Sequence, residues 1–112
     1  QVYGGSIEEA KSEFIRGYDL AGGQAEIYLQ HFIQNVAPCE GSWLSNPGNP
    51  NYRGMAQFHP NTWVRARRLP ESDWRDFYEQ GYAVANWINI LLASESHPDG
   101  TGGWPVCWWK GL

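Results

Sequence analysis

The chain has 112 residues, of which 42% are hydrophobic, 15% aromatic and only 18% charged, with a formal net charge of -4. That length predicts one domain with a single core, and the composition excludes an intrinsically disordered chain. The acidic balance argues against a general nucleic-acid binder, which is normally basic. No apolar run approaches the roughly 18 residues that a membrane-spanning helix needs. We therefore expect a compact, aromatic-rich monomer with no nucleic-acid partner and no membrane span.

The first helical signal is a capping box at Ser6 and Glu9, in which each side chain accepts the other residue's backbone N–H. Apolar residues continue at helical spacing, and Gly17 is expected to interrupt the helix. We treat residues 1–26 as an N-terminal helical extension and residues 27–112 as the main domain.

A second helix is expected from about Gln24, and Pro38 should end or kink it at its last turn. Residues 39–58 hold glycines, prolines and asparagines that cannot all sit in regular elements. A long irregular loop in a compact domain is usually functional. We therefore look for the functional site here.

Three further helical segments are expected after the loop. Pro60 predicts the first turn of a short helix over residues 60–68. A cap at Ser72 or Asp73 opens the next helical stretch. The longest helix follows that stretch, and its buried stripe is Val84, Trp87, Ile88, Leu91 and Leu92. No strand pattern alternates convincingly, so the fold class is mainly α with little or no β-sheet.

The two cysteines, Cys39 and Cys107, are too few for a structural zinc site and too far apart for a redox pair. Two unpaired core cysteines are the alternative, but polar, loop-like or Trp-rich settings favour a single disulfide. A disulfide is typical of an exported protein. His31, His59 and His97 are scattered without a second ligand at metal spacing, so we expect no metal and no other cofactor.

One acidic residue differs from the rest. Most of the others, Glu79 among them, lie on helix faces as ordinary solvated charges. Glu40 ends the second predicted helix beside an apolar and aromatic pair at residues 43–44, and no Lys or Arg lies between positions 31 and 52. Burial, the negative end of a helix and this lack of a nearby cation would all raise its pKa. A carboxylic acid that stays protonated near neutral pH suits acid-catalysed cleavage of a glycosidic bond. The competing interpretation is an exposed residue that follows a helix.

Residues 41–70 contain no Asp or Glu, yet they are rich in amide and aromatic side chains. These are Asn46, Asn49, Asn51, Asn61, Gln57, Tyr52 and Trp63. Amides and aromatic faces recognise neutral sugars through hydrogen bonds and stacking. Trp43 and Trp104 are flanked by Gly, Ser or Pro and are candidates for a cleft, whereas core packing is expected for Trp63 and Trp87.

Three motifs occur in order along the chain: residues 36–43 (VAPCEGSW), 54–63 (GMAQFHPNTW) and 103–107 (GWPVC). Together they resemble the catalytic domain of bacterial resuscitation-promoting factors, which belongs to the lysozyme-like superfamily with lytic transglycosylases and goose-type lysozymes. The resemblance covers about residues 27–108. The sequence departs from the family pattern at Pro38, in the order of Gly and Ser after Glu40, and in a loop at residues 45–52 that is rich in Pro and Asn.

The resemblance implies a single lysozyme-like domain in which Glu40 is the catalytic acid of a peptidoglycan-cleaving enzyme and Cys39 pairs with Cys107. It also implies that Gln57 and Tyr52 line the sugar cleft, and that Tyr82 matches a tyrosine that contacts the glutamate in related transglycosylases. Together with the composition, these matches give the expected substrate-binding set Gln57, Tyr52, Trp43, Asn46, Asn49, Tyr82 and Trp104.

An ordinary glycosidase uses two carboxylates, roughly 5–5.5 Å apart for retention or roughly 6.5–9.5 Å apart for inversion. The stretch after Glu40 supplies no second one. We therefore expect a lytic transglycosylase that acts on the β-1,4 linkage between N-acetylmuramic acid and N-acetylglucosamine. The alternative enzyme is a hydrolytic muramidase, for which Asp73, Asp76 or Asp99 could serve as base.

Two non-enzymatic hypotheses remain open. The protein is either a module that binds cell-wall glycan or a small interaction domain held together by a disulfide. The only basic cluster, Arg65, Arg67 and Arg68, is either a solvated helix face or a surface that attracts acidic peptide stems or wall polymers. The expected partner is the peptidoglycan glycan strand, and the expected location is secreted or associated with the bacterial cell wall.

Overall fold

The computed structural model describes residues 6–40, 43, 48–49, 51–98, 100, 102–105 and 107–108, with residues 48–49 described by their backbone only. The helical elements are α1 (Ile7–Ala21), the 3₁₀ segment η1 (Gly23–Tyr28), α2 (Leu29–His31), the π-helical segment η2 (Phe32–Val36), α3 (Ala37–Glu40), α4 (Pro60–Ala66) and α5 (Phe77–Ala93). A short antiparallel pair is formed by β1 (Gly48–Asn49) and β2 (Tyr52–Arg53). In the described part of the chain the fold is mainly α-helical with almost no β-sheet, as the sequence predicts.

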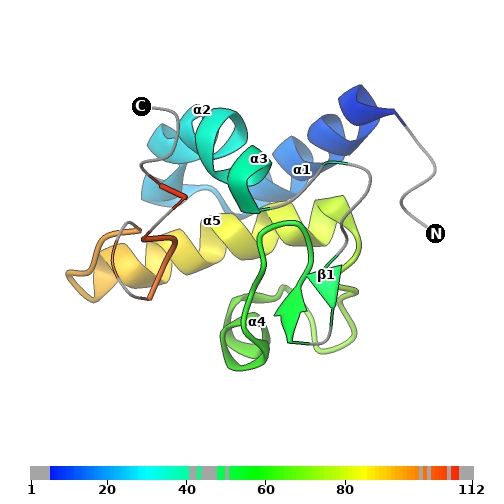
Figure 1. Ribbon diagram of the computed structural model, residues 1–112. Helices are drawn as coiled ribbons and strands as arrows, with labels where there is room; N and C mark the ends of the chain where they lie inside the picture. The colour runs from blue at the N-terminus through cyan, green and yellow to red at the C-terminus, as the bar shows by residue number, and fades with distance from the viewer. Residues whose placement is uncertain are drawn as a thin grey trace.

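Helix α5 is the element around which the others are arranged. In Figure 1 it crosses the middle of the molecule, with α1, α2 and α3 on one side and α4 and the β1–β2 pair on the other. The side chain of Asp76 caps α5 by accepting the backbone N–H of Tyr78 at 2.9 Å. The separate helical stretch expected to begin at Ser72 or Asp73 is not observed, because the structure describes residues 67–76 and has no helix there before the start of α5 at Phe77.

Glu79, in the first turn of α5, is buried rather than solvated. Its carboxylate accepts hydrogen bonds from Arg68 at 2.7 and 3.3 Å and from the Ser72 hydroxyl at 2.8 Å. These bonds tie the segment between α4 and α5 to the start of the long helix. A buried carboxylate is stable here because it is fully partnered.

Helix α1 begins with the predicted capping box, in which Ser6 and Glu9 exchange hydrogen bonds of 3.0 and 3.1 Å. It continues through Gly17, which does not interrupt it. A Cβ atom at Gly17 would lie 1.9 Å from the carbonyl oxygen of Tyr78 on α5. A Cβ at Gly81 would lie 1.9 Å from the carbonyl oxygen of Phe14 on α1. The two glycines therefore let α1 and α5 cross with their backbones in contact.

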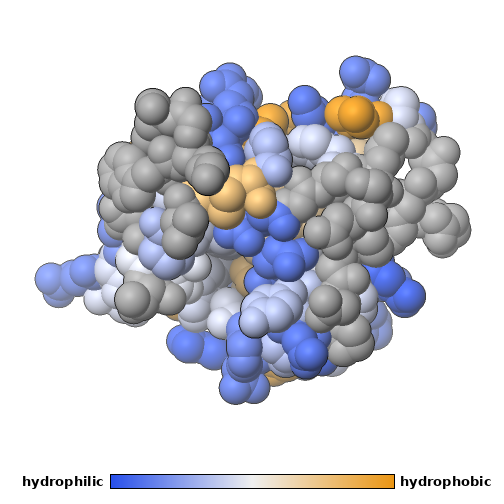
Figure 2. Space-filling view, viewed as in Figure 1, coloured by the Kyte–Doolittle hydropathy of each residue, from blue (hydrophilic) through white to orange (hydrophobic). Residues whose placement is uncertain are grey.

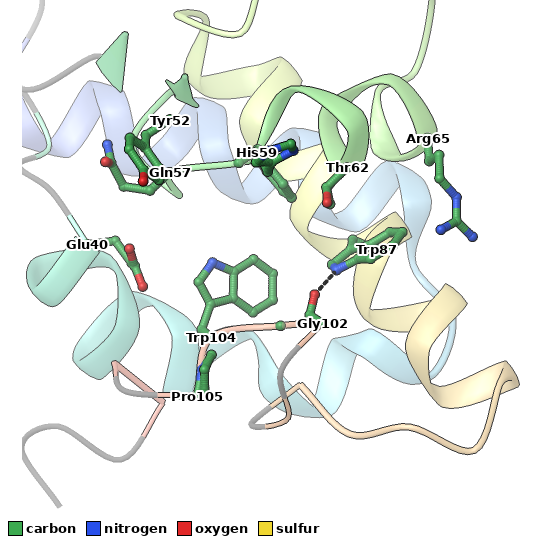
Figure 3. Close-up of a pocket in the computed structure, with 12 residues that line it drawn as sticks. Glu40, Tyr52, Gln57, His59, Thr62, Arg65, Trp87, Gly102, Trp104 and Pro105 are labelled. Atoms are coloured by element: carbon green, nitrogen blue, oxygen red, sulfur yellow. Dashed lines mark hydrogen bonds between the residues drawn. The ribbon is translucent and has the colours of Figure 1, made fainter. Parts of the chain in front are cut away.

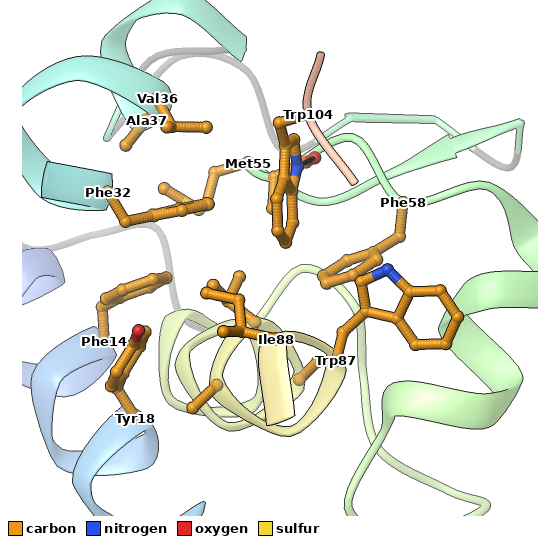
Figure 4. Packing of buried hydrophobic residues seen from close by; sticks show 14 of the residues in the cluster. Phe14, Tyr18, Phe32, Val36, Ala37, Met55, Phe58, Trp87, Ile88 and Trp104 are labelled. Carbon is orange, nitrogen blue, oxygen red and sulfur yellow. Dashed lines mark hydrogen bonds between the residues drawn. The ribbon is translucent and has the colours of Figure 1, made fainter. Parts of the chain in front are cut away.

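One hydrophobic core joins the described elements, and Figure 4 shows part of it. Phe14 and Tyr18 of α1 are fully buried and lie beside Phe32 and Ile88 in that view. Trp63 is 1% exposed, as expected for a core residue. The described part of the segment assigned to an N-terminal extension thus shares the core of the remaining chain.

The helix that leads to Glu40 is not ended by Pro38. The chain stays helical from Leu29 to Glu40, and the turn just before Pro38 is a π turn in which Ala37 N–H bonds to the carbonyl of Phe32, five residues back. A proline ring inside a regular α-helix clashes with the carbonyl four residues earlier. The wider π turn relieves that clash, so Glu40 occupies the last helical position. Such π turns are frequent at functional sites.

Where Figure 2 colours the surface by hydropathy, it is mostly hydrophilic, with apolar colour confined to small patches. None of the described helices is long and apolar enough to cross a membrane.

We expect the Gly17→Ala variant to be about 2 kcal/mol less stable to unfolding, because its Cβ would push α1 away from the backbone of α5. Without that contact the same change would stabilise the helix by about 1 kcal/mol. Urea unfolding followed by circular dichroism measures the difference. Ser12→Ala, at an exposed position of α1, is the control and should change stability by less than about 0.5 kcal/mol. A gain in stability for Gly17→Ala would contradict the close crossing.

Candidate active site

A cavity of about 560 Å³ opens between the end of α3, the segment that follows β2, helix α4 and the C-terminal tail. Its described lining is Glu40, Tyr52, Gln57, Phe58, His59, Thr62, Arg65, Trp87, Gly102, Gly103, Trp104 and Pro105. Figure 3 shows Glu40 and Arg65 at opposite ends of this lining, with the Trp104 indole between them. The volume lies within the range of small-ligand sites.

Glu40 is a partly buried carboxyl group that faces this cavity (Figure 3). Its burial disfavours the anion and raises its pKa to about 7. Within the described part of the chain, no hydrogen bond or ion pair to the carboxyl group offsets that effect. Burial is one of the three causes that the sequence suggested for a raised pKa, and the group is half protonated near neutral pH.

Gln57 and Tyr52 lie across the cavity from Glu40 (Figure 3). Gln57 has a φ of 60°, in the left-handed region that non-glycine residues rarely adopt. Its Nε2 donates a 3.0 Å hydrogen bond to the Gly54 carbonyl, so the side chain has a fixed direction. The segment is closed by paired backbone bonds between Arg53 and Phe58, of 2.7 and 3.0 Å. Strained backbone that the surroundings hold in place is common at functional sites.

Trp104 forms the floor of the cavity and is 5% exposed. Its Nε1 donates a 3.0 Å hydrogen bond to the Ala56 carbonyl, and its ring packs edge-on against Phe32 at 5.0 Å between ring centroids. The tail that carries Trp104 is joined to α3 by a disulfide between Cys39 and Cys107. That pairing was expected and is confirmed.

The structure places two of the expected binding residues away from the cavity. Trp43 is buried in the core, with its ring 5.5 Å from that of Phe14 and 5.9 Å from that of Phe77. Tyr82 lies on α5 where that helix crosses α1, and its backbone N is close to Gly17. Neither is among the described lining residues. Flanking Gly and Ser residues suggested a cleft position for Trp43, but a large ring close to α1 is more stable when buried.

Asn46 lies outside the described residues, and of Asn49 only the backbone is described. Two of the candidate bases are engaged elsewhere: Asp73 pairs with Arg75 at 3.0 Å and Asp76 caps α5. Asp99 also lies outside the described residues. Among the lining residues that the structure describes, Glu40 is the only carboxylate.

Several lining residues were not singled out as site residues from the sequence. His59, Thr62 and Arg65 recur every third residue and fall on the cavity side of α4, whereas Trp63 and Ala66 of that helix are buried. The interval of three residues between His59, Thr62 and Arg65 is the sequence pattern that indicates a shared helix face. His59 accepts the Asn61 N–H at Nδ1 over 3.2 Å, so the neutral ring carries its proton on Nε2.

Trp87 both packs in the core, as expected, and lines the cavity. Its Nε1 donates a 2.7 Å hydrogen bond to the Gly102 carbonyl, the dashed line in Figure 3. The guanidinium of Arg65 lies over its ring, 5.0 Å from the centroid. A core residue of α5 thus supports a charged side chain of α4 at the cavity.

No family model, no curated protein and no solved structure matches this chain. Among the described residues, no group of three or more His, Cys, Asp or Glu side chains is arranged to hold a metal ion. The side chains that line the cavity are therefore the basis for inferring its chemistry. Those side chains offer one protonatable carboxyl group, several neutral polar groups and an arginine.

Removing the disulfide should lower the free energy of unfolding by about 4 kcal/mol, because the bond closes a loop with a sequence separation of 68 residues. Urea unfolding of the wild type with and without a reducing agent measures this loss. The control is a variant in which Cys39 and Cys107 are both alanine, whose stability should not respond to the reductant. A loss below about 1 kcal/mol would show that the tail is held mainly by packing.

The raised pKa of Glu40 also predicts how stability depends on pH. Between about pH 4.5 and pH 7 the folded protein holds a proton there that the unfolded chain has released, so stability falls as pH rises through this window. The Glu40→Gln variant lacks this titration. It should gain on the order of 1–2 kcal/mol relative to the wild type between pH 4 and pH 8, an amount reduced for partial exposure to solvent. Urea midpoints of both proteins across this range test the prediction, and a difference independent of pH would contradict it.

Proposed function

We propose that this protein is a lytic transglycosylase of lysozyme-like fold that cleaves the β-1,4 linkage between N-acetylmuramic acid and N-acetylglucosamine in peptidoglycan. One observation carries the proposal: among the described lining residues, Glu40 alone bears a carboxyl group, its pKa is raised to about 7, and the other side chains around the cavity are mostly polar or aromatic. The three sequence motifs that resemble resuscitation-promoting factors supply residues of this same cavity.

In this proposal Glu40 acts first as an acid. Its proton goes to the glycosidic oxygen, which leaves as a hydroxyl group when the bond to C1 of the muramic residue breaks. A carboxyl group with a pKa near 7 is protonated often enough at neutral pH, and is acidic enough, to make this transfer. Partial burial without a cationic partner is the condition that creates such an acid.

Glu40 then acts as a base. The acetamido oxygen of the substrate stabilises the positive charge that develops at C1 as the bond breaks. The Glu40 carboxylate takes the proton of the C6 hydroxyl, and that oxygen bonds to C1, which closes a 1,6-anhydro ring and returns the acid to its starting state. This sequence needs no second carboxylate, in agreement with a described lining in which Glu40 is the only one.

The other wall offers contacts for a neutral sugar chain. The hydrogen bond from Gln57 Nε2 to Gly54 leaves Oε1 without a partner among the described residues, so it can accept a sugar hydroxyl. The neutral His59 ring has an N–H at Nε2 to donate. Fixed polar groups above an apolar floor are the usual arrangement of a carbohydrate site.

The disulfide supports an exported protein, since such bonds persist in oxidising compartments. An enzyme that acts on the cell wall needs that location. We therefore propose a secreted or wall-associated protein.

Replacing Glu40 by Gln should lower the rate of cell-wall solubilisation by at least about 100-fold, because the amide cannot donate or accept the reaction's protons. Turbidity of purified peptidoglycan, followed with wild type and variant, measures the loss. Glu71→Gln is the matched control, since it removes one exposed carboxylate outside the cavity, and it should keep full activity.

The products separate the alternative functions. Mass spectrometry should find glycan ends lighter by one water than those that hydrolysis gives, which identifies the anhydro ring. Products with the added water would make the protein a muramidase. Glycan binding without any cleavage by the wild type would leave only a binding module, and the transglycosylase proposal would be wrong.

A further inference from the structure

The end of the cavity opposite Glu40 holds a positive charge. Arg65 lines the cavity from α4, and its guanidinium stacks on the face of Trp87, 5.0 Å from the ring centroid. Trp87 is itself fixed by core packing and by its 2.7 Å bond to Gly102. The guanidinium therefore rests on a rigid support. Stacking of this kind leaves the N–H groups at the edge of the guanidinium plane free to bind an anion.

Arg65 differs in this respect from its two basic neighbours. Arg68 is paired with the buried Glu79 at 2.7 Å, and Arg67 donates a 3.1 Å hydrogen bond to the Pro70 carbonyl. Neither lines the cavity. Within the described part of the chain, Arg65 has no ion pair or hydrogen bond, so its charge is available to a ligand. The basic cluster of the sequence is thus three arginines with separate roles.

The negative net charge of the whole protein makes the local positive charge of Arg65 informative about the ligand. The formal net charge is -4, so bulk attraction cannot bring an anionic polymer to the cavity. Selection of a negatively charged group has to come from a specific contact. Of the described residues that line the cavity, Arg65 is the only one with a permanent positive charge.

We propose that Arg65 binds a carboxylate of the peptide that is attached to the muramic residue, and so makes the site select peptide-bearing glycan over an uncharged sugar chain. This inference rests on the proposed function and specifies its substrate further. The sugar rings of the strand are neutral, so the negative charge of such a substrate resides on its peptide substituents. A planar guanidinium matches a carboxylate with two parallel hydrogen bonds.

Binding to soluble glycan–peptide fragments tests the inference directly. The fragments are used with free carboxylates and, as a neutral counterpart of nearly equal size, with the carboxylates converted to amides. All binding is measured by calorimetry in the Glu40→Gln background, so that no cleavage intervenes. We expect the charged fragment to bind about tenfold more tightly, which corresponds to about 1.4 kcal/mol.

Replacing Arg65 by Gln should abolish this preference, and Arg67→Gln, which removes an equal charge two residues further along the chain, should retain it. The preference should also weaken as salt is raised, a measurement that needs no variant at position 65. Equal binding of the two fragments, or the same effect of both arginine variants, would overturn the role of Arg65 while glycan binding still supported the proposed function. If neither fragment binds, both the role of Arg65 and the proposed function are wrong.

Discussion

The packing of Trp104 is the interaction on which the cavity depends. Its indole lies between Phe32 from the helical run that leads to Glu40 and Phe58 from the opposite wall, 5.0 and 5.9 Å away between ring centroids. Its Nε1 bonds to the Ala56 carbonyl, one residue before Gln57. One buried ring thus fixes the spacing between the acid and the facing amide. The disulfide to α3 keeps the tail that carries this ring in place.

The properties of Glu40 follow from its position at the end of a helix that passes through a proline. The π turn before Pro38 keeps the chain helical for two residues beyond it, which brings Glu40 to the rim of the cavity. At this position the carboxyl group is buried enough for its pKa to rise, yet it still lines the cavity and can contact a ligand. Glu79 is the opposite case. Its buried carboxylate accepts hydrogen bonds from Arg68 and from the Ser72 hydroxyl, and it stabilises the start of α5.

The two ends of the cavity are specialised in different ways. The Glu40 end combines a protonatable group with the strained Gln57 backbone, whereas the other end holds a permanent charge stacked on Trp87. Helix α5 supplies that tryptophan from its buried stripe, and α4 supplies the arginine from its exposed face. The geometry therefore joins a protonatable carboxyl group at one end of the cavity with a stacked guanidinium at the other, and both rest on the same core.

Local signals in the sequence determined much of this protein. The capping box, the helix opened by Pro60, the apolar stripe of the long helix and the residue types around Glu40 all act over a few positions, so they could be recognised without knowing the fold. Burial of Glu40 was one of two interpretations that the sequence left open, and Trp43 and Leu44, three and four residues further on, favoured it.

Only the tertiary structure decided which surfaces meet. Trp43 is buried against α1 and Tyr82 lies at the α1–α5 crossing, whereas Arg65 and Trp87 line the cavity, and none of this is encoded within a short window. A ring or a charge takes its role from neighbours that are distant in the chain, here brought together by two glycines that let helices touch and by one disulfide. The sequence alone therefore indicated most of the helices and the unusual carboxyl group of Glu40, because these depend on neighbours within a few positions. Long-range packing determined the shape of the cavity and placed the Arg65 guanidinium in it.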